Sequence, residues 1–319
     1  MSEALGVRAA AVWLGRRGTF AALLLLLLVN AAITPHFLAW QTLAVNATQV
    51  ATIIIVATGM TLVIATGGID LSVGSLMAIA GTLSPMIFGG RFGALPAGLA
   101  DALAILVPIL VAGSFGWING LFVTVLRIQP IVATLILFIA GRGIAQVATN
   151  GNLQPFTRPA VQWIGLGRLA GIPVQVLLAA VAVALAAGAV RRTVWGRQVL
   201  AIGGNEHAAM LAGVPIGRIK RSVYVASGLC AGIAGLVTVA INSSSDANTV
   251  GLGMELDAIA AVAVGGTPLA GGSAHLVGTL LGAMVIQLVR YMLLANGVPD
   301  AAALVVKAGL IIAAVALRR

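Results

Sequence analysis

The sequence contains few charged residues, a single cysteine and only three histidines, and each shortage excludes a class of protein. Charged residues form 8% of the 319 positions, whereas soluble domains carry about 25%, so the chain is not a soluble globular protein. Because Cys230 has no second cysteine to pair with, an intrachain disulfide is excluded. The histidines (His36, His207 and His275) lie far apart in sequence, so we expect no metal site and no cofactor.

The sequence also lacks the motifs of common enzymes. Neither Lys220 nor Lys307 follows a glycine and precedes a serine or threonine, so there is no Walker A phosphate-binding loop. No Ser-His-Asp or Cys-His arrangement has a spacing that supports nucleophilic catalysis. We therefore expect no catalytic residues and no ATPase activity in this chain.

Long apolar runs dominate the composition instead. Hydrophobic residues form 60% of the chain and the mean hydropathy is +1.10. A membrane-spanning helix needs about 20 mainly apolar residues, and runs rich in Leu and Ala without strict alternation favour helices over membrane strands. We predict an all-α polytopic membrane protein in a single transmembrane domain, residues 1–319, with about ten spans at 18–38, 44–66, 72–90, 98–126, 129–149, 173–190, 222–242, 255–271, 275–295 and 300–317.

The net charge of +10 is distributed as the positive-inside rule requires. With ten alternating spans, most of the Lys and Arg fall on one side together with both termini, so we predict cytoplasmic N- and C-termini and a cytoplasmic loop at 191–221. The first run is expected to be retained rather than cleaved as a signal peptide, since cleavage would leave nine spans. Nucleic acid is not an expected partner, because no basic stripe is interleaved with aromatic residues.

Glycine-rich segments interrupt two of the apolar runs. The first, 66–72, contains Gly67, Gly68, Asp70 and Ser72. The second, 251–257, ends in Glu255 and Asp257, which suit the first turn of a helix. Each segment is compatible with a tight turn and a helix cap, or with a broken helix beside a translocation path.

Three further polar or aromatic side chains lie inside predicted spans. Arg142 could extend its guanidinium to the membrane surface, pair with a carboxylate or contact a substrate. Trp117 and Asn119 suit a sugar ring by their flat face and their amide, but they equally suit packing and a hydrogen bond between helices.

The loop at 191–221 contains a predicted short helix. Asn205 suits the N-cap, Glu206 lies in the first turn with Ala208 and Ala209 following, and Gly213 ends the helix. A helix of this length is marginal alone in water. It is therefore either a docking element for a partner or a solvated loop helix.

The chain contains one long motif, GMTLVIATGGIDLSVGS at 59–75, and shorter ones at 119–120 (NG), 130–135 (PIVATL), 141–143 (GRG), 255–261 (ELDAIAA) and 265–267 (GGT). Together these motifs resemble the ribose/galactose-type ABC sugar importer permeases. The segments IQP at 128–130 and GRGIAQ at 141–146 are most similar to galactofuranose permeases, whereas Ser273-Ala274-His275 departs from the usual turn after Gly271-Gly272.

This resemblance implies partners and a function. It implies a multi-pass subunit of the bacterial inner membrane, surrounded by lipid, that pairs with a second, identical or different permease. It further implies ATPase subunits, a periplasmic sugar-binding protein and a monosaccharide substrate. The segment from Glu206 to Gly213 resembles the family's coupling helix, and 67–72 would border the substrate path. The alternatives are a proton-coupled secondary transporter, or an ABC permease for a branched-chain amino acid or a nucleoside.

Overall fold

The computed structural model describes residues 2–93, 95–299, 302, 305–306 and 308–309, and the side chains from residue 18 onward. Within this part the chain is mainly helical, which confirms the all-α class. The helices are α1 (Ser2–Ile33), α2 (Trp40–Ala65), α3 (Val73–Phe88), α4 (Ala97–Thr124), α5 (Pro130–Thr149), α6 (Pro159–Leu166), α7 (Val174–Arg192), α8 (Val194–Gly204), α9 (Glu206–Leu211), α10 (Ile216–Asn242), α11 (Met254–Gly265) and α12 (Leu276–Ala295).

Two antiparallel pairs of two-residue strands accompany the helices. The strand β1 (Gln154–Pro155) pairs with β4 (Ser244–Ser245), with Gln154 opposite Ser245. The strand β2 (Arg168–Leu169) pairs with β3 (Ile172–Pro173) in a hairpin that follows α6. The first pair fastens the segment after α5 to the segment after α10.

The number of membrane spans is only partly confirmed. Among the described residues, six helices are long and apolar enough to cross a membrane: α2, α4, α5, α7, α10 and α12. Two shorter apolar helices, 18–33 and 73–88, lie where the first and third spans were predicted. The predicted eighth span, 255–271, contains the 12-residue helix α11, about 18 Å long and too short to cross about 30 Å of hydrocarbon. The predicted tenth span, 300–317, lies mostly outside the described residues.

The helix α2 forms the centre of the bundle. In the most apolar 18-residue stretch of α2, 83% is buried, whereas 28% is buried in the corresponding stretches of α4 and α5. Helices in lipid associate through close packing rather than the hydrophobic effect, so small residues mark their contacts. Between α4 and α10, a Cβ on Gly116 would overlap the carbonyl oxygen of Tyr224, and a Cβ on Gly228 would overlap that of Ala112. Glycine therefore lets these two backbones touch.

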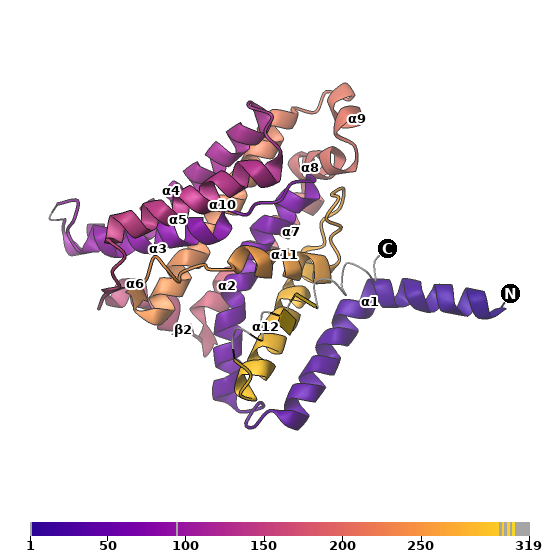
Figure 1. The fold of residues 1–319 in the computed structure, drawn as a ribbon, viewed down its shortest axis with the longest axis horizontal. Helices are drawn as coiled ribbons and strands as arrows, with labels where there is room; N and C mark the ends of the chain where they lie inside the picture. The colour runs from indigo at the N-terminus through magenta and orange to yellow at the C-terminus, as the bar shows by residue number, and fades with distance from the viewer. Residues whose placement is uncertain (1, 94, 300–301, 303–304, 307, 310–319) are drawn as a thin grey trace.

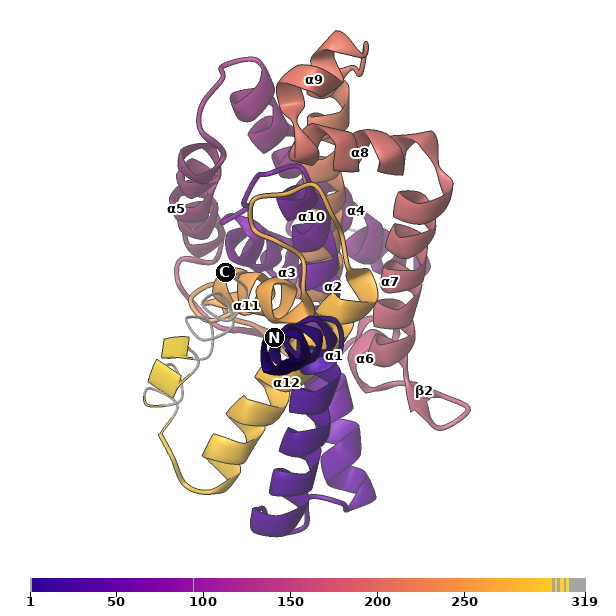
Figure 2. The same cartoon turned by 90° about the vertical axis from the view of Figure 1, so that its right-hand side faces the viewer.

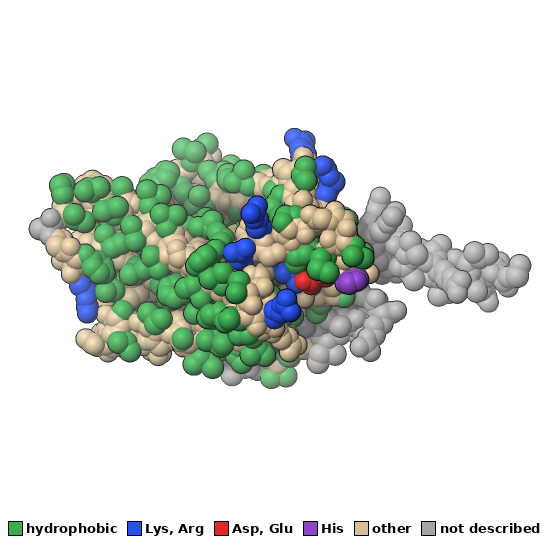
Figure 3. All heavy atoms as spheres, turned by 90° about the horizontal axis from the view of Figure 1, so that it is seen from above, with side chains coloured by type: hydrophobic (Ala, Val, Ile, Leu, Met, Phe, Trp, Pro, Cys, Tyr) green, Lys and Arg blue, Asp and Glu red, His purple; other side chains and the backbone are tan. Residues whose placement is uncertain are grey.

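The elements separate into an end with short helices and a broad apolar body. Figures 1 and 2 show α8 and α9 together at one end, with α1, α2 and α12 reaching the opposite end. Seen from above the view of Figure 1, Lys and Arg side chains gather mainly near α8 and α9, and hydrophobic side chains cover much of the remaining face (Figure 3). The outer faces of α4 and α5 expose large apolar side chains, among them Leu110, Ile139 and Val147.

Candidate functional site

The predicted break at 66–72 separates α2 from α3. The helix α2 ends at Ala65, and Gly67 adopts a φ of +78°, which glycine reaches without steric cost. Ser72 precedes α3 but makes no side-chain cap hydrogen bond. Instead, Asp70 accepts hydrogen bonds from the Ser72 N–H at 3.0 Å and from the Ser72 hydroxyl at 2.7 Å. The carboxylate therefore fixes the turn that restarts the helix.

A buried polar cluster surrounds Asp70. The side chain of Asp70 has 0% exposure, and the hydroxyl of Ser227 in α10 donates to its second carboxylate oxygen at 2.8 Å. Asn119 in α4 is equally buried and donates from Nδ2 to the Ser72 hydroxyl at 2.8 Å. The cluster thus joins the break to α4 and α10. Asp70, Ser72 and Asn119 have no exposed surface in the single chain.

Two members of this cluster were not predicted from the sequence. Tyr224 and Ser227 lie three positions apart on one face of the mainly apolar part of α10 that follows Ser222, and that spacing was the available signal. A Cβ on Gly68 would lie 2.7 Å from the Tyr224 hydroxyl oxygen, so Tyr224 requires glycine there. In contrast, Trp117, two positions before Asn119 in α4, is half-exposed.

Arg142 binds backbone carbonyls. Its Nη1 donates to Ala247 at 2.9 Å and to Val250 at 2.6 Å, and its Nη2 approaches Gly74 in α3 at 3.4 Å. The guanidinium therefore fastens the segment between α10 and α11 to α3 and α5.

The second predicted break lies between α10 and α11. Gly251 and Gly253 both have positive φ, and α11 begins at Met254. Glu255 and Asp257 lie in the first turn of α11 as predicted, each with 6% of its surface exposed. One Glu255 carboxylate oxygen approaches Gly74, since a Cβ there would lie 2.5 Å from it. The two breaks are thus in contact through α3.

Asp246 organises the loop that Arg142 holds. Its carboxylate accepts hydrogen bonds from the Asn248 N–H and side-chain amide, both at 2.9 Å, and from the Thr249 hydroxyl at 3.0 Å. These donors, led by the Asn248 N–H, hold the pKa of Asp246 below its ordinary value of 3.8.

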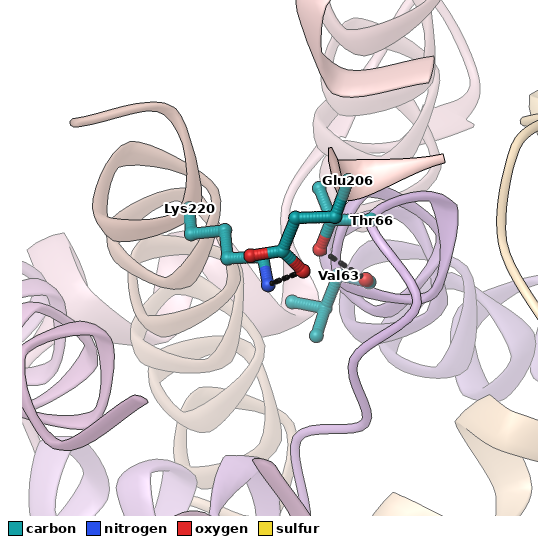
Figure 4. A network of polar contacts seen from close by, with 4 residues as sticks. All are labelled: Val63, Thr66, Glu206 and Lys220. Carbon is teal, nitrogen blue, oxygen red and sulfur yellow. Dashed lines mark hydrogen bonds and ion pairs between the residues drawn. The ribbon is translucent and has the colours of Figure 1, made fainter. Parts of the chain in front are cut away.

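The predicted short helix at 205–213 is confirmed. The side chain of Asn205 caps α9 by accepting from the Ala208 N–H at 2.9 Å, and Gly213 ends the turn with a φ of +79°. Glu206 forms an ion pair with Lys220 of α10, with 2.6 Å between Oε2 and Nζ (Figure 4). The same figure shows the end of α2, where the Thr66 hydroxyl donates to the Val63 carbonyl. Ala209 is buried. Met210 and Leu211 are 54% and 76% exposed, an apolar tip on an otherwise basic end.

Comparison with known proteins identifies the family of this chain. The family model described as "branched-chain amino acid transport system / permease component" matches residues 42–315. The chain belongs to this permease family. The galactofuranose transporter permease protein of Escherichia coli K12 is 42% identical over 297 residues, 90% of this chain and 84% of that protein. The ribose import permease protein of the same strain is 39% identical over 307 residues, 95% of this chain and 93% of that protein.

A third relative of the permease extends the range of sugars. The fructose import permease protein of Bifidobacterium longum is 37% identical over 249 residues, 77% of this chain and 68% of that protein. The resemblance stated from the motifs is thereby confirmed. No solved structure matches the chain.

Proposed function

We propose that this permease is the membrane subunit of an ATP-binding-cassette importer that moves a monosaccharide from periplasm to cytoplasm, with ATP hydrolysed by a separate subunit. The observation that carries the proposal is the similarity over most of the chain to permeases named for galactofuranose, ribose and fructose. The family description names branched-chain amino acids, and these sugar relatives favour a sugar substrate instead. Galactofuranose is the first substrate to test.

The proposed path follows the cluster around Asp70, with Gly67, Gly68, Ser72 and Asn119. Hydroxyl, amide and carboxylate groups are the chemistry that binds sugar hydroxyls, and here they sit where α2 is broken, as in other transporters. Arg142, Asp257 and Trp117 stay candidates for path residues by position alone. Because the cluster is closed in the single chain, alternating access would open it.

The proposed partners are assigned to different surfaces. The helix α9, with Asn205, Glu206, Ala208, Ala209 and Gly213, docks in a groove of the ATPase, supported by its exposed Met210 and Leu211. The positive-inside rule puts this end and both termini in the cytoplasm of a bacterial cell. A periplasmic sugar-binding protein then meets the opposite end. The exposed apolar faces of α4 and α5 meet lipid or a second, identical or different permease subunit.

Reconstitution into liposomes with the ATPase and binding protein tests the function. We expect uptake of labelled galactofuranose, ribose or fructose that stops without ATP and survives an uncoupler. Uptake that collapses with the uncoupler but continues without ATP would identify a proton-coupled carrier. Uptake of leucine or of a nucleoside in place of sugar would assign the chain to the other substrates considered.

A further inference from the structure

Three backbone segments, at the end of α2, near the end of α8 and in the loop after α11, are in direct contact. The Gly272 N–H donates to the Ala65 carbonyl, at the end of α2, at 3.1 Å. A Cβ on Gly203 in α8 would overlap the Ala65 carbonyl oxygen and lie 2.5 Å from the Gly272 nitrogen. A Cβ on Gly271 would lie 2.8 Å from the Gly67 nitrogen and 3.1 Å from the Gly203 Cα. We call these five residues the glycine junction.

Each segment of the junction leads to a different part of the proposed transport machinery. The helix α8 ends at Gly204 and continues through Asn205 directly into α9. Gly67 begins the break that carries Asp70. Gly271 and Gly272 lie in the loop between α11 and α12, which Thr267 braces by accepting from the His275 N–H at 2.9 Å. Figure 2 shows this loop rising from α11 toward α8.

We propose that Gly203 is a positioning residue for transport, and that the glycine junction passes a displacement of α9 to the break at 66–72 and to the loop after α11. This inference rests on the proposed docking of α9 on the ATPase. A backbone that moves toward another in direct contact displaces it, because packed interiors have low compressibility and transmit strain. Gly203 lies inside a helix, so the close contact rather than an unusual φ requires glycine there.

The test compares Gly203→Ala with Gly204→Ala in the reconstituted importer, with galactofuranose as the labelled probe. The two positions are adjacent in α8 and gain the same helix propensity from alanine. A Cβ on Gly204 meets nothing within 4 Å, which makes it the matched control. We expect Gly203→Ala to assemble and hydrolyse ATP while the sugar transported per ATP falls about tenfold, a size typical of coupling between sites. Gly204→Ala should transport as much sugar per ATP as the unsubstituted importer.

An unchanged ratio of sugar to ATP in Gly203→Ala would overturn the inference. If Gly203→Ala fails to fold, hydrogen exchange on the unsubstituted importer decides. Nucleotide trapping should then alter exchange at 65–68 and 270–272 together with 203–205, and a change confined to 203–211 would overturn the inference.

A Gly213→Val variant separates the two proposals. If it lowers the ratio and Gly203→Ala does not, docking of α9 stands and the junction falls; if neither does, docking itself falls.

Discussion

Asp70 shows how single residues hold this fold at a broken helix. It has no exposed surface, and one N–H and two hydroxyls donate to it. Buried polar groups without partners are costly, so these donors stabilise the cluster. Sequence reasoning identified Asp70, Ser72 and Asn119, since polar residues in apolar runs are conspicuous. It missed Ser227 and Tyr224, because a polar residue on a long helix does not reveal which of its faces meets a distant break.

The contact between Gly68 and Tyr224 gives a prediction at this scale. Gly68→Ala should destabilise the protein by about 1–3 kcal/mol, as overpacking does, because its Cβ would lie 2.7 Å from the tyrosine oxygen. Adding Tyr224→Phe should restore much of that loss, since this oxygen has no hydrogen-bond partner among the described residues. Thermal unfolding in detergent of the two single variants and the double variant measures it. Additive losses in the double variant would contradict the contact.

Asp246 gives a pH-dependent prediction. Because its folded pKa is lowered from 3.8, it contributes stability above that pH, and this stability is lost as pH falls through the folded pKa. Asp246→Asn should therefore lower the melting temperature at pH 7. The difference from the unchanged protein should shrink as pH falls below about 3.8. A difference that stays constant with pH would contradict a role for the ionised carboxylate.

At the scale of elements, local signals proved easier to interpret than long-range ones. The helix α9 was predicted with its caps, because Asn205 and Gly213 act within one turn. The preceding helix α8 was not predicted, and it contains Gly203 and Gly204, of which at least Gly203 is explained by close packing. The span at 255–271 is not confirmed, because α11 ends at Gly265, before a left-handed Gly266 that hydropathy does not reveal.

The end of α9 gives the element-scale prediction. Gly213 has a φ of +79°, a conformation that costs other residues about 1–2 kcal/mol. Gly213→Val should therefore displace α9, and uptake should fall while ATP hydrolysis and membrane insertion continue. The matched control is Ala212→Val, at a neighbouring position with an ordinary φ of −78°. Parallel assays of ATPase and uptake measure the effect, and normal uptake in Gly213→Val would remove the coupling role.

For the whole molecule, the family and the helical class followed from the sequence, whereas the number of spans is confirmed only in part. Composition indicated the membrane, and contiguous motifs indicated the permease family. How far each helix is buried inside the bundle depends on its packing against other helices. The contrast between the buried α2 and the largely exposed α4 and α5 shows this. Pairing of β1 with β4 joins residues that lie far apart in sequence, and no local pattern predicts it.

Orientation in the membrane gives the prediction at this scale. Single cysteines at Arg197 and Arg218, in a Cys230→Ser background, should react with an impermeant thiol reagent only from the cytoplasmic side. A cysteine at Arg168, on the exposed β2 hairpin, should react from the periplasmic side. Intact cells and inverted vesicles provide the two sides. Periplasmic labelling at positions 197 and 218 would reverse the topology and remove the proposed ATPase docking end.

The way Arg142 fastens the segment after α10 has a consequence for where such a transporter can work. A guanidinium offers five donors, accepts nothing and keeps its proton at any pH that cells meet. Its acceptors, Ala247, Val250 and Gly74, are peptide carbonyls, which do not titrate. The three hydrogen bonds themselves therefore do not titrate, and an acidic exterior weakens this attachment only through the carboxylates that interact with the guanidinium, Glu255 and Asp246.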